Sequence, residues 1–146
     1  MVALKTHIPS NFPFMPEQKL KQLQFEIEGW KRLLGFMVDE NIQLKERLAF
    51  VLGNGFNQHL LEDAEQFQNS FLHNDEVIRM LRNDVADLDR LMSMEIFEDM
   101  KTLQNIDRKL ELTRINIVKA EIKFGRLQSA FNRYMNENIL RPAAKK

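Results

Sequence analysis

Apolar residues recur along three stretches of the chain at alternating steps of three and four positions. A spacing that averages about 3.5 residues keeps one stripe of a helix facing a partner helix along its length. The first stripe is Leu20, Leu23, Ile27, Trp30, Leu34, Met37, Asn41, Leu44, Leu48 and Val51. The second is Leu60, Ala64, Phe67, Phe71, Asn74, Ile78, Leu81, Val85, Leu88 and Met92. The third is Leu103, Ile106, Leu110, Thr113, Ile117, Ala120, Phe124, Leu127, Phe131 and Tyr134. We call these stripes together the seam, and each predicts one long amphipathic helix.

Residues that favour helix ends lie at the borders of the first two stripes. Pro16 suits the first position of a helix, so the first helix is expected to begin there. It should end near Leu52, because residues 53–55 read Gly-Asn-Gly and can adopt left-handed backbone conformations. Asn57 is a candidate N-cap for a second helix that runs to about Met92.

The boundary between the second and third helices is marked by a change of phase. Continuing the second stripe does not meet the third, which is displaced by one position, so we expect a break or sharp bend within residues 93–97. A competing break lies at residues 73–76, where Asp75 offers an N-cap. The third helix is expected to reach about Asn138.

The predicted fold class is all-α: an elongated, antiparallel three-helix bundle with a coiled-coil-like seam. Residues 16–138 would form this single domain, and residues 139–146 a C-terminal tail. Pro9 and Pro13 predict an extended arm over residues 1–15. The arm contains aromatic residues and would pack either on its own bundle or on a partner.

The third helix carries a second apolar face on the side opposite the seam. At about 100° per residue, four aliphatic residues fall on that side, which a helix with one solvated face would not carry. They are Leu112, Ile115, Val118 and Ile122. A weaker counterpart on the first helix consists of Phe25, Phe36 and Phe50. We predict that the chain forms a homo-oligomer, with a dimer as the expected form, through these seven residues. The alternative is that bent packing or the N-terminal arm covers them.

Three polar residues interrupt the seam: Asn41, Asn74 and Thr113. In an antiparallel hairpin that turns near residue 95, Asn74 lies level with Thr113 and Asn116, which would allow a shared polar layer. The alternative is that Asn74 marks a helix break or a solvated edge. A buried asparagine costs stability unless it is paired, so the substitution Asn41→Leu is expected to stabilise the fold.

Composition narrows the functional classes. The chain has 146 residues, enough for one domain, and its 21 Lys and Arg residues balance 21 Asp and Glu. Nucleic-acid-binding proteins normally have a basic excess, so no nucleic-acid partner is expected. The absence of cysteine excludes disulfides and thiolate chemistry. No stretch approaches the ~18 apolar residues of a transmembrane helix, and the N-terminus lacks a signal-peptide segment, which predicts a cytoplasmic protein.

Candidate chemistry is sparse. None of the three histidines has the glutamate three positions earlier that a di-iron bundle requires. A phosphate-binding glycine loop and a serine nucleophile motif are also absent from the sequence, so we expect no enzyme and no cofactor. The richest carboxylate run surrounds the predicted turn between the second and third helices, close to Met92, Met94 and Met100. It consists of Asp84, Asp87, Asp89, Glu95, Glu98 and Asp99. Binding of a metal or small ligand there is the alternative function.

The segment Asp75–Val85, with the sequence DEVIRMLRNDV, resembles a segment of small uncharacterised helical proteins of Bacteroidota. The resemblance implies a bacterial cytoplasmic setting and no particular activity. Together with the helical faces, it leads us to expect a non-enzymatic interaction or scaffold module. Its partners would be a second copy of the chain and, beyond that, another protein.

Overall fold

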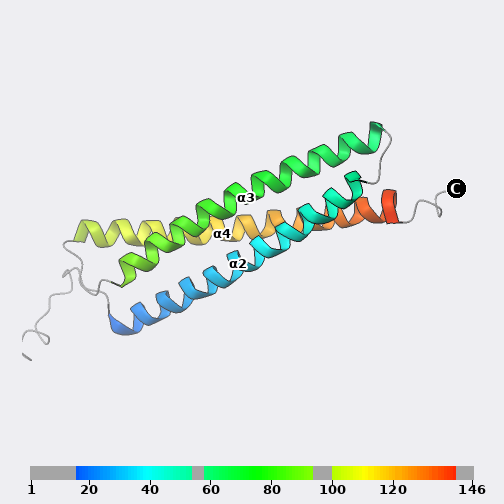
Figure 1. Ribbon diagram of the computed structural model, residues 1–146. Coiled ribbons are helices and arrows are strands. Elements are labelled where there is room, and N and C mark those ends of the chain that lie inside the picture. Colours follow the sequence, from blue (N-terminus) through cyan, green and yellow to red (C-terminus); the bar gives the residue numbers. More distant parts are fainter. Residues whose placement is uncertain (1–15, 54–57, 94–99, 141–146) are drawn as a thin grey trace, which may run out of the picture.

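The structure, a computed structural model, describes residues 16–53, 58–93 and 100–140 (Figure 1). These residues form three long helices that pack side by side: α2 (Glu17–Gly53), α3 (Gln58–Met92) and α4 (Met100–Met135). A single π-helical turn, η1 (Asn136–Leu140), continues α4. The protein is therefore an all-α three-helix bundle, and the predicted fold class is confirmed.

Most helix ends agree with the sequence pattern. The helix α2 begins at Glu17, and the backbone N–H of Leu20 donates to the carbonyl of Pro16 at 2.9 Å, which supports the first turn. The helix α3 ends at Met92, as predicted. It is continuous through residues 73–76, so the competing break at that point is wrong. The predicted arm over residues 1–15, the cap Asn57 and the final residues 141–146 lie outside the described residues.

The helices α2 and α4 run in the same direction, and α3 runs opposite to both (Figure 1). Side-chain pairs fix the register of the two parallel helices. Glu26 of α2 pairs with Arg114 of α4, and Glu40 of α2 pairs with Gln128 of α4; both separations are 88 residues. A residue of α2 is therefore level with the residue of α4 that lies 88 positions later in the chain.

The seam forms the core. Nearly all of its residues are buried, and those that are only partly buried pack against the buried ones. The partly buried seam residues are Leu20, Leu60, Phe67, Leu103 and Leu127. Each large apolar side chain removed from water contributes about 1.5–3 kcal/mol, so the seam accounts for most of the stabilisation of the bundle. The periodicity of the sequence thus predicts which face of every helix is buried.

The polar seam residues join different helices from those expected. The Asn74 side-chain amide donates to the Oδ1 atom of Asn41 at 3.3 Å, so the polar layer links α3 to α2. Asn41 in turn donates to the carbonyl of Phe71 at 3.0 Å and to Oδ1 of Asp75 at 2.5 Å. The predicted level of Asn74 with Thr113 and Asn116 is wrong: the pairs Asp87–Lys109 and Phe67–Phe131 place Asn74 level with about residue 123, roughly two turns further along α4. The amide of Asn74 points to α2 because the Oδ1 atom of buried Asn41 accepts its hydrogen bond.

An aromatic cluster closes the end of the bundle where α3 begins and α4 ends. Phe131 meets the rings of Phe67 and Phe71 edge-on, with centroids 5.2 Å and 5.1 Å away. The guanidinium of Arg47, from α2, lies 5.2 Å from the centroid of Phe131. The hydroxyl of Tyr134 donates to the carbonyl of Leu60 at 3.0 Å. Edge-to-face pairs each add about 0.5–1.5 kcal/mol beyond burial, so this cluster ties α4 to α3.

Candidate functional site

The four aliphatic residues predicted on the outer face of α4 lie together and are exposed. Leu112, Ile115, Val118 and Ile122 each have between 40% and 54% of their surface accessible. They follow each other at steps of three and four along an unbroken helix, so they occupy one side of it over about 15 Å. We call these four residues the α4 outer face. No other side chain of the described chain covers them sufficiently to bury them.

The three phenylalanines of α2 are also exposed, at 58% to 75%, but they do not form one patch. Helical rise places Phe25 and Phe36 about 16 Å apart, and Phe50 about 21 Å further along. By the offset of 88 residues between the parallel helices, Phe25 is level with Thr113 and Phe36 with Phe124. Phe25 and Phe36 therefore lie level with the two ends of the α4 outer face, whereas Phe50 lies beyond it.

An ion pair holds the orientation of α4 relative to α2. Arg114 contacts both carboxylate oxygens of Glu26, at 2.8 Å and 2.7 Å, and also Glu111 at 2.7 Å. The hydrogen bonds to Glu26 are the main cause of a pKa of Arg114 raised above its ordinary value. The groups are about a third exposed, so the pair contributes little stability. Its bidentate geometry does fix which side of α4 turns toward α2, and this leaves the α4 outer face pointing away from the bundle.

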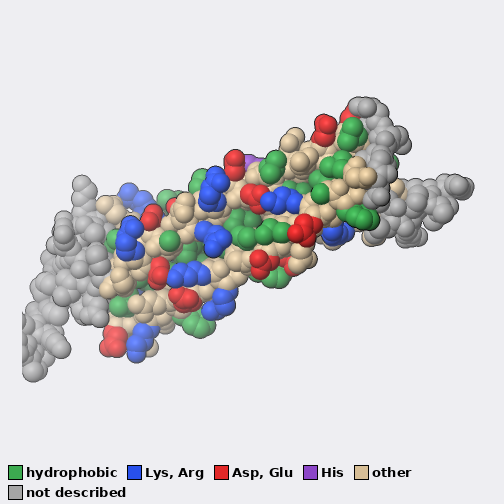
Figure 2. Space-filling view, viewed as in Figure 1, with side chains coloured by type: hydrophobic (Ala, Val, Ile, Leu, Met, Phe, Trp, Pro, Cys, Tyr) green, Lys and Arg blue, Asp and Glu red, His purple; other side chains and the backbone are tan. Residues whose placement is uncertain are grey.

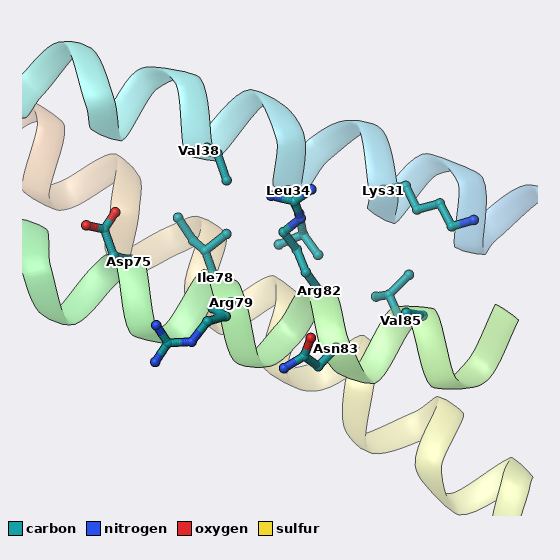
Figure 3. Close-up of a pocket in the computed structure, with 10 residues that line it drawn as sticks. Lys31, Leu34, Val38, Asp75, Ile78, Arg79, Arg82, Asn83 and Val85 are labelled. Carbon is teal, nitrogen blue, oxygen red and sulfur yellow. The ribbon is translucent and has the colours of Figure 1, made fainter. Parts of the chain in front are cut away.

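A groove of about 680 Å³ runs between α2 and α3. Figure 3 shows Leu34 and Val38 of α2 and Ile78 of α3 between the two helices. Charged pairs cross this boundary: Lys31 contacts Asp89 at 2.5 Å, and Lys45 contacts Asp75 at 2.6 Å. The hydrogen bond from Lys31 to Asp89 raises the pKa of that lysine. Both lysines are thus neutralised within the chain, whereas Arg79 and Arg82, which also line the groove, form no ion pair with a described residue.

A second groove, of about 620 Å³, runs between α3 and α4. Sequence reasoning missed it, although its polar residues share a recognisable position. Lys119 and Lys123 each come directly before a seam residue, and so does His73 on α3. Residues next to the seam flank the contact between two helices. Comparing the residues that precede the seam on α3 with those that precede it on α4 would have indicated the groove.

The acidic run of the alternative metal site lies only partly within the described residues. Within residues 16–53, 58–93 and 100–140, the structure contains no cluster of three or more His, Asp or Glu side chains placed to hold a metal ion. Of the expected acidic run, Glu95, Glu98 and Asp99 lie outside the described residues. Asp87 pairs with Lys109 at 3.4 Å, and Asp89 pairs with Lys31.

Charges of both signs are interspersed on the surface. Figure 2 shows one face of the bundle, on which Lys and Arg side chains alternate with Asp and Glu, with hydrophobic side chains between them. None of the helices in the described part of the chain has an apolar stretch of the length needed to cross a membrane. Comparisons of the chain with protein-family models, with curated proteins and with solved structures found no match. The resemblance of residues 75–85 to Bacteroidota proteins stays a prediction.

Proposed function

We propose that this chain is a non-enzymatic interaction module that self-associates through the α4 outer face. The exposure of Leu112, Ile115, Val118 and Ile122 on one side of a rigid helix is the observation that supports the proposal. Exposed apolar residues that stand singly are common on protein surfaces, whereas a contiguous group on one helix face is typical of an interface. A second copy of the chain is the partner, through a two-fold contact in which the same face meets itself.

The apolar area of the α4 outer face sets the expected strength of self-association. Each of the four side chains is about half exposed, so its remaining burial would contribute roughly 1 kcal/mol. Two copies together would gain about 8 kcal/mol, against an association cost of about 4–15 kcal/mol. The α4 outer face alone therefore supports a weak dimer, and Phe25 and Phe36, level with its two ends, would strengthen it. A scaffold that presents further helix faces to another protein is the finer form of this proposal.

The test is a double substitution on α4, Val118→Glu with Ile122→Glu. Two carboxylates at the centre of the contact would have to lose their hydration, so the variant is expected to be folded but monomeric. Light scattering after gel filtration, over a range of protein concentrations, measures the mass. Circular dichroism verifies that the helical content is unchanged.

A matched control has the same chemical change on another helix. Leu61 and Leu72 of α3 are 36% and 50% exposed, and the substitutions Leu61→Glu with Leu72→Glu should leave the association state unchanged. The proposal is wrong if the native chain is a monomer throughout the concentration series. It is equally wrong if the α4 variant associates as the native chain does.

A further inference from the structure

The groove between α3 and α4 has an apolar floor and a polar border. The apolar part consists of Val77, Met80 and Leu81 of α3 and of Ala120 and Leu127 of α4. The polar residues that line it include Asn69, Ser70, His73, Asn116, Lys119 and Lys123. Its lining residues are drawn from the sides of α3 and α4 that face each other. Lys119 lies one helical turn from Ile115 and from Ile122, so the groove adjoins the α4 outer face but shares no residue with it.

The charge of this groove is unbalanced. Lys119 and Lys123 are exposed and form no ion pair with any residue that the structure describes. By contrast, Lys31, Lys45 and Lys109 each contact a carboxylate on a neighbouring helix. No carboxylate occurs among the residues that line the α3–α4 groove. Two adjacent uncompensated ammonium groups over apolar surface favour an occupant with negative charge.

The acidic residues closest in sequence do not compensate these lysines. Asp75, which follows the groove residue Asn74, is directed to α2 and contacts Lys45 at 2.6 Å. Glu76 and Glu121 are exposed and are not part of the groove lining. Neither lysine therefore has an ion-pair partner among the described acidic residues next to the groove.

The shape of the groove fits a helix. Its lining spans residues 69–81 of α3 and residues 116–127 of α4, which is about 18 Å, or three helical turns. Beyond one end, Lys109 contacts Asp87 across the two helices; at the other end lies the aromatic pair of Phe67 and Phe131. A trough between two antiparallel helices with an apolar floor is the usual seat of an amphipathic helix, which lays one face into it.

We propose that the α3–α4 groove binds an acidic amphipathic helix of a partner protein. Apolar side chains of that helix lie on Val77, Leu81 and Ala120, and its carboxylates pair with Lys119 and Lys123. This inference rests on the proposed interaction role of the chain but uses a different surface. The two proposals can therefore fail separately.

The probe is a synthetic helical peptide of about three to four turns with leucines on one face and glutamates beside them. A second peptide with lysine at every glutamate position serves as the charge control. Fluorescence anisotropy of labelled peptide against the full chain, at physiological salt, should show binding of the acidic peptide and at least about tenfold weaker binding of the basic one. Reversing the charge of both groove lysines, Lys119→Glu with Lys123→Glu, should weaken acidic-peptide binding by at least about tenfold.

The matched variant has the same charge change on the other side of α3. Arg79 and Arg82 line the α2–α3 groove, and Arg79→Glu with Arg82→Glu should leave acidic-peptide binding within about twofold of the native chain. An equal loss in both variants would mean general attraction between opposite charges and would overturn the proposal. So would the absence of acidic-peptide binding by the native chain at millimolar peptide.

Measurements of mass separate this proposal from self-association. The variant with Lys119→Glu and Lys123→Glu should associate like the native chain, because the α4 outer face is intact. A neutral variant of that face, Val118→Ser with Ile122→Ser, should still bind the acidic peptide. If the lysine variant instead becomes monomeric, the occupant of the groove is a second copy of the chain, and the proposed partner helix is wrong.

Discussion

Between α2 and α3, directional polar contacts cross a buried boundary; between α3 and α4, aromatic rings gather at one end. Asn41 is fully buried and bonds to Asn74 and Asp75, and two ion pairs lie on the same boundary. The α3–α4 boundary depends on Phe131, Tyr134 and the rings they meet, and its middle is an open groove. The side of α3 that faces α2 thus holds a buried amide network, whereas the groove that faces α4 is lined by two lysines and no carboxylate.

The difference shows how a regular heptad pattern produces two unlike surfaces. The hydrogen bonds of a buried amide specify the register of two helices. Because its donors and acceptors are then satisfied within the chain, they are not available to bind another protein. Aromatic packing needs only a short length of helix to hold two elements together, because each ring buries a large area. The remainder of that boundary is then free to present lysines and apolar groups to another molecule.

The largest expected effect comes from Phe131→Ala. Phe131 is fully buried and contacts Phe67 and Phe71, so its removal leaves a cavity that should lower the free energy of unfolding by about 3–5 kcal/mol. Urea unfolding at pH 7 measures the change. The control Leu72→Ala, at a half-exposed residue next to Phe71, should stay within about 0.5 kcal/mol of the native chain. Similar losses in both variants would contradict the assignment of the aromatic cluster as the principal α3–α4 contact.

The next effect is that of Asn41→Leu. Sequence alone predicted that this change stabilises the fold, but the structure gives Asn41 three hydrogen bonds, and this reverses the expected sign. Removing them leaves Asn74 buried without its partner, which should lower the free energy of unfolding by about 2 kcal/mol. Thermal melting compares it with Asn116→Leu, a control at the exposed α3–α4 groove. A melting temperature at or above that of the native chain would refute the paired role of Asn41.

The smallest effect, Tyr134→Phe, has a pH signature. Loss of the hydroxyl bond to the Leu60 carbonyl should cost about 1 kcal/mol at neutral pH. Burial, and secondarily Asp63, raise the pKa of Tyr134 above its ordinary value of 10.0. A raised folded-state pKa gives stability that is complete below pH 10.0 and is lost as pH rises through the folded value. The native chain should therefore lose its advantage over Tyr134→Phe in alkali.

Unfolding curves between neutral and strongly alkaline pH measure this convergence. Tyr134 is the single tyrosine of the chain, so the ultraviolet absorbance of tyrosinate reports its pKa directly. Titration at or below the ordinary value in the folded protein would show that the hydroxyl is not held in a desolvated site.

Parts of the candidate site were predictable from the sequence and parts were not. The exposure of Leu112, Ile115, Val118 and Ile122 followed from the helical period, because a residue opposite the seam of a bundle helix must face outward. The groove with Lys119 and Lys123 was not predicted. The residues that precede the seam indicate its position, but its uncompensated charge depends on which neighbouring carboxylates turn to other helices, as Asp75 does toward Lys45, and local spacing carries no record of that choice.

The sequence by itself determined the class of fold, the number of helices and the face that each one buries, because these depend on a period repeated over many residues. Local residues also determined the end of α3 at Met92, where the phase changes. Only the tertiary structure decided that Asn74 bonds to Asn41 and that Phe25 and Phe36 lie level with the ends of the α4 outer face. Such pairings depend on the rotation and register of one helix against another, and these are set by the packing of all three helices together.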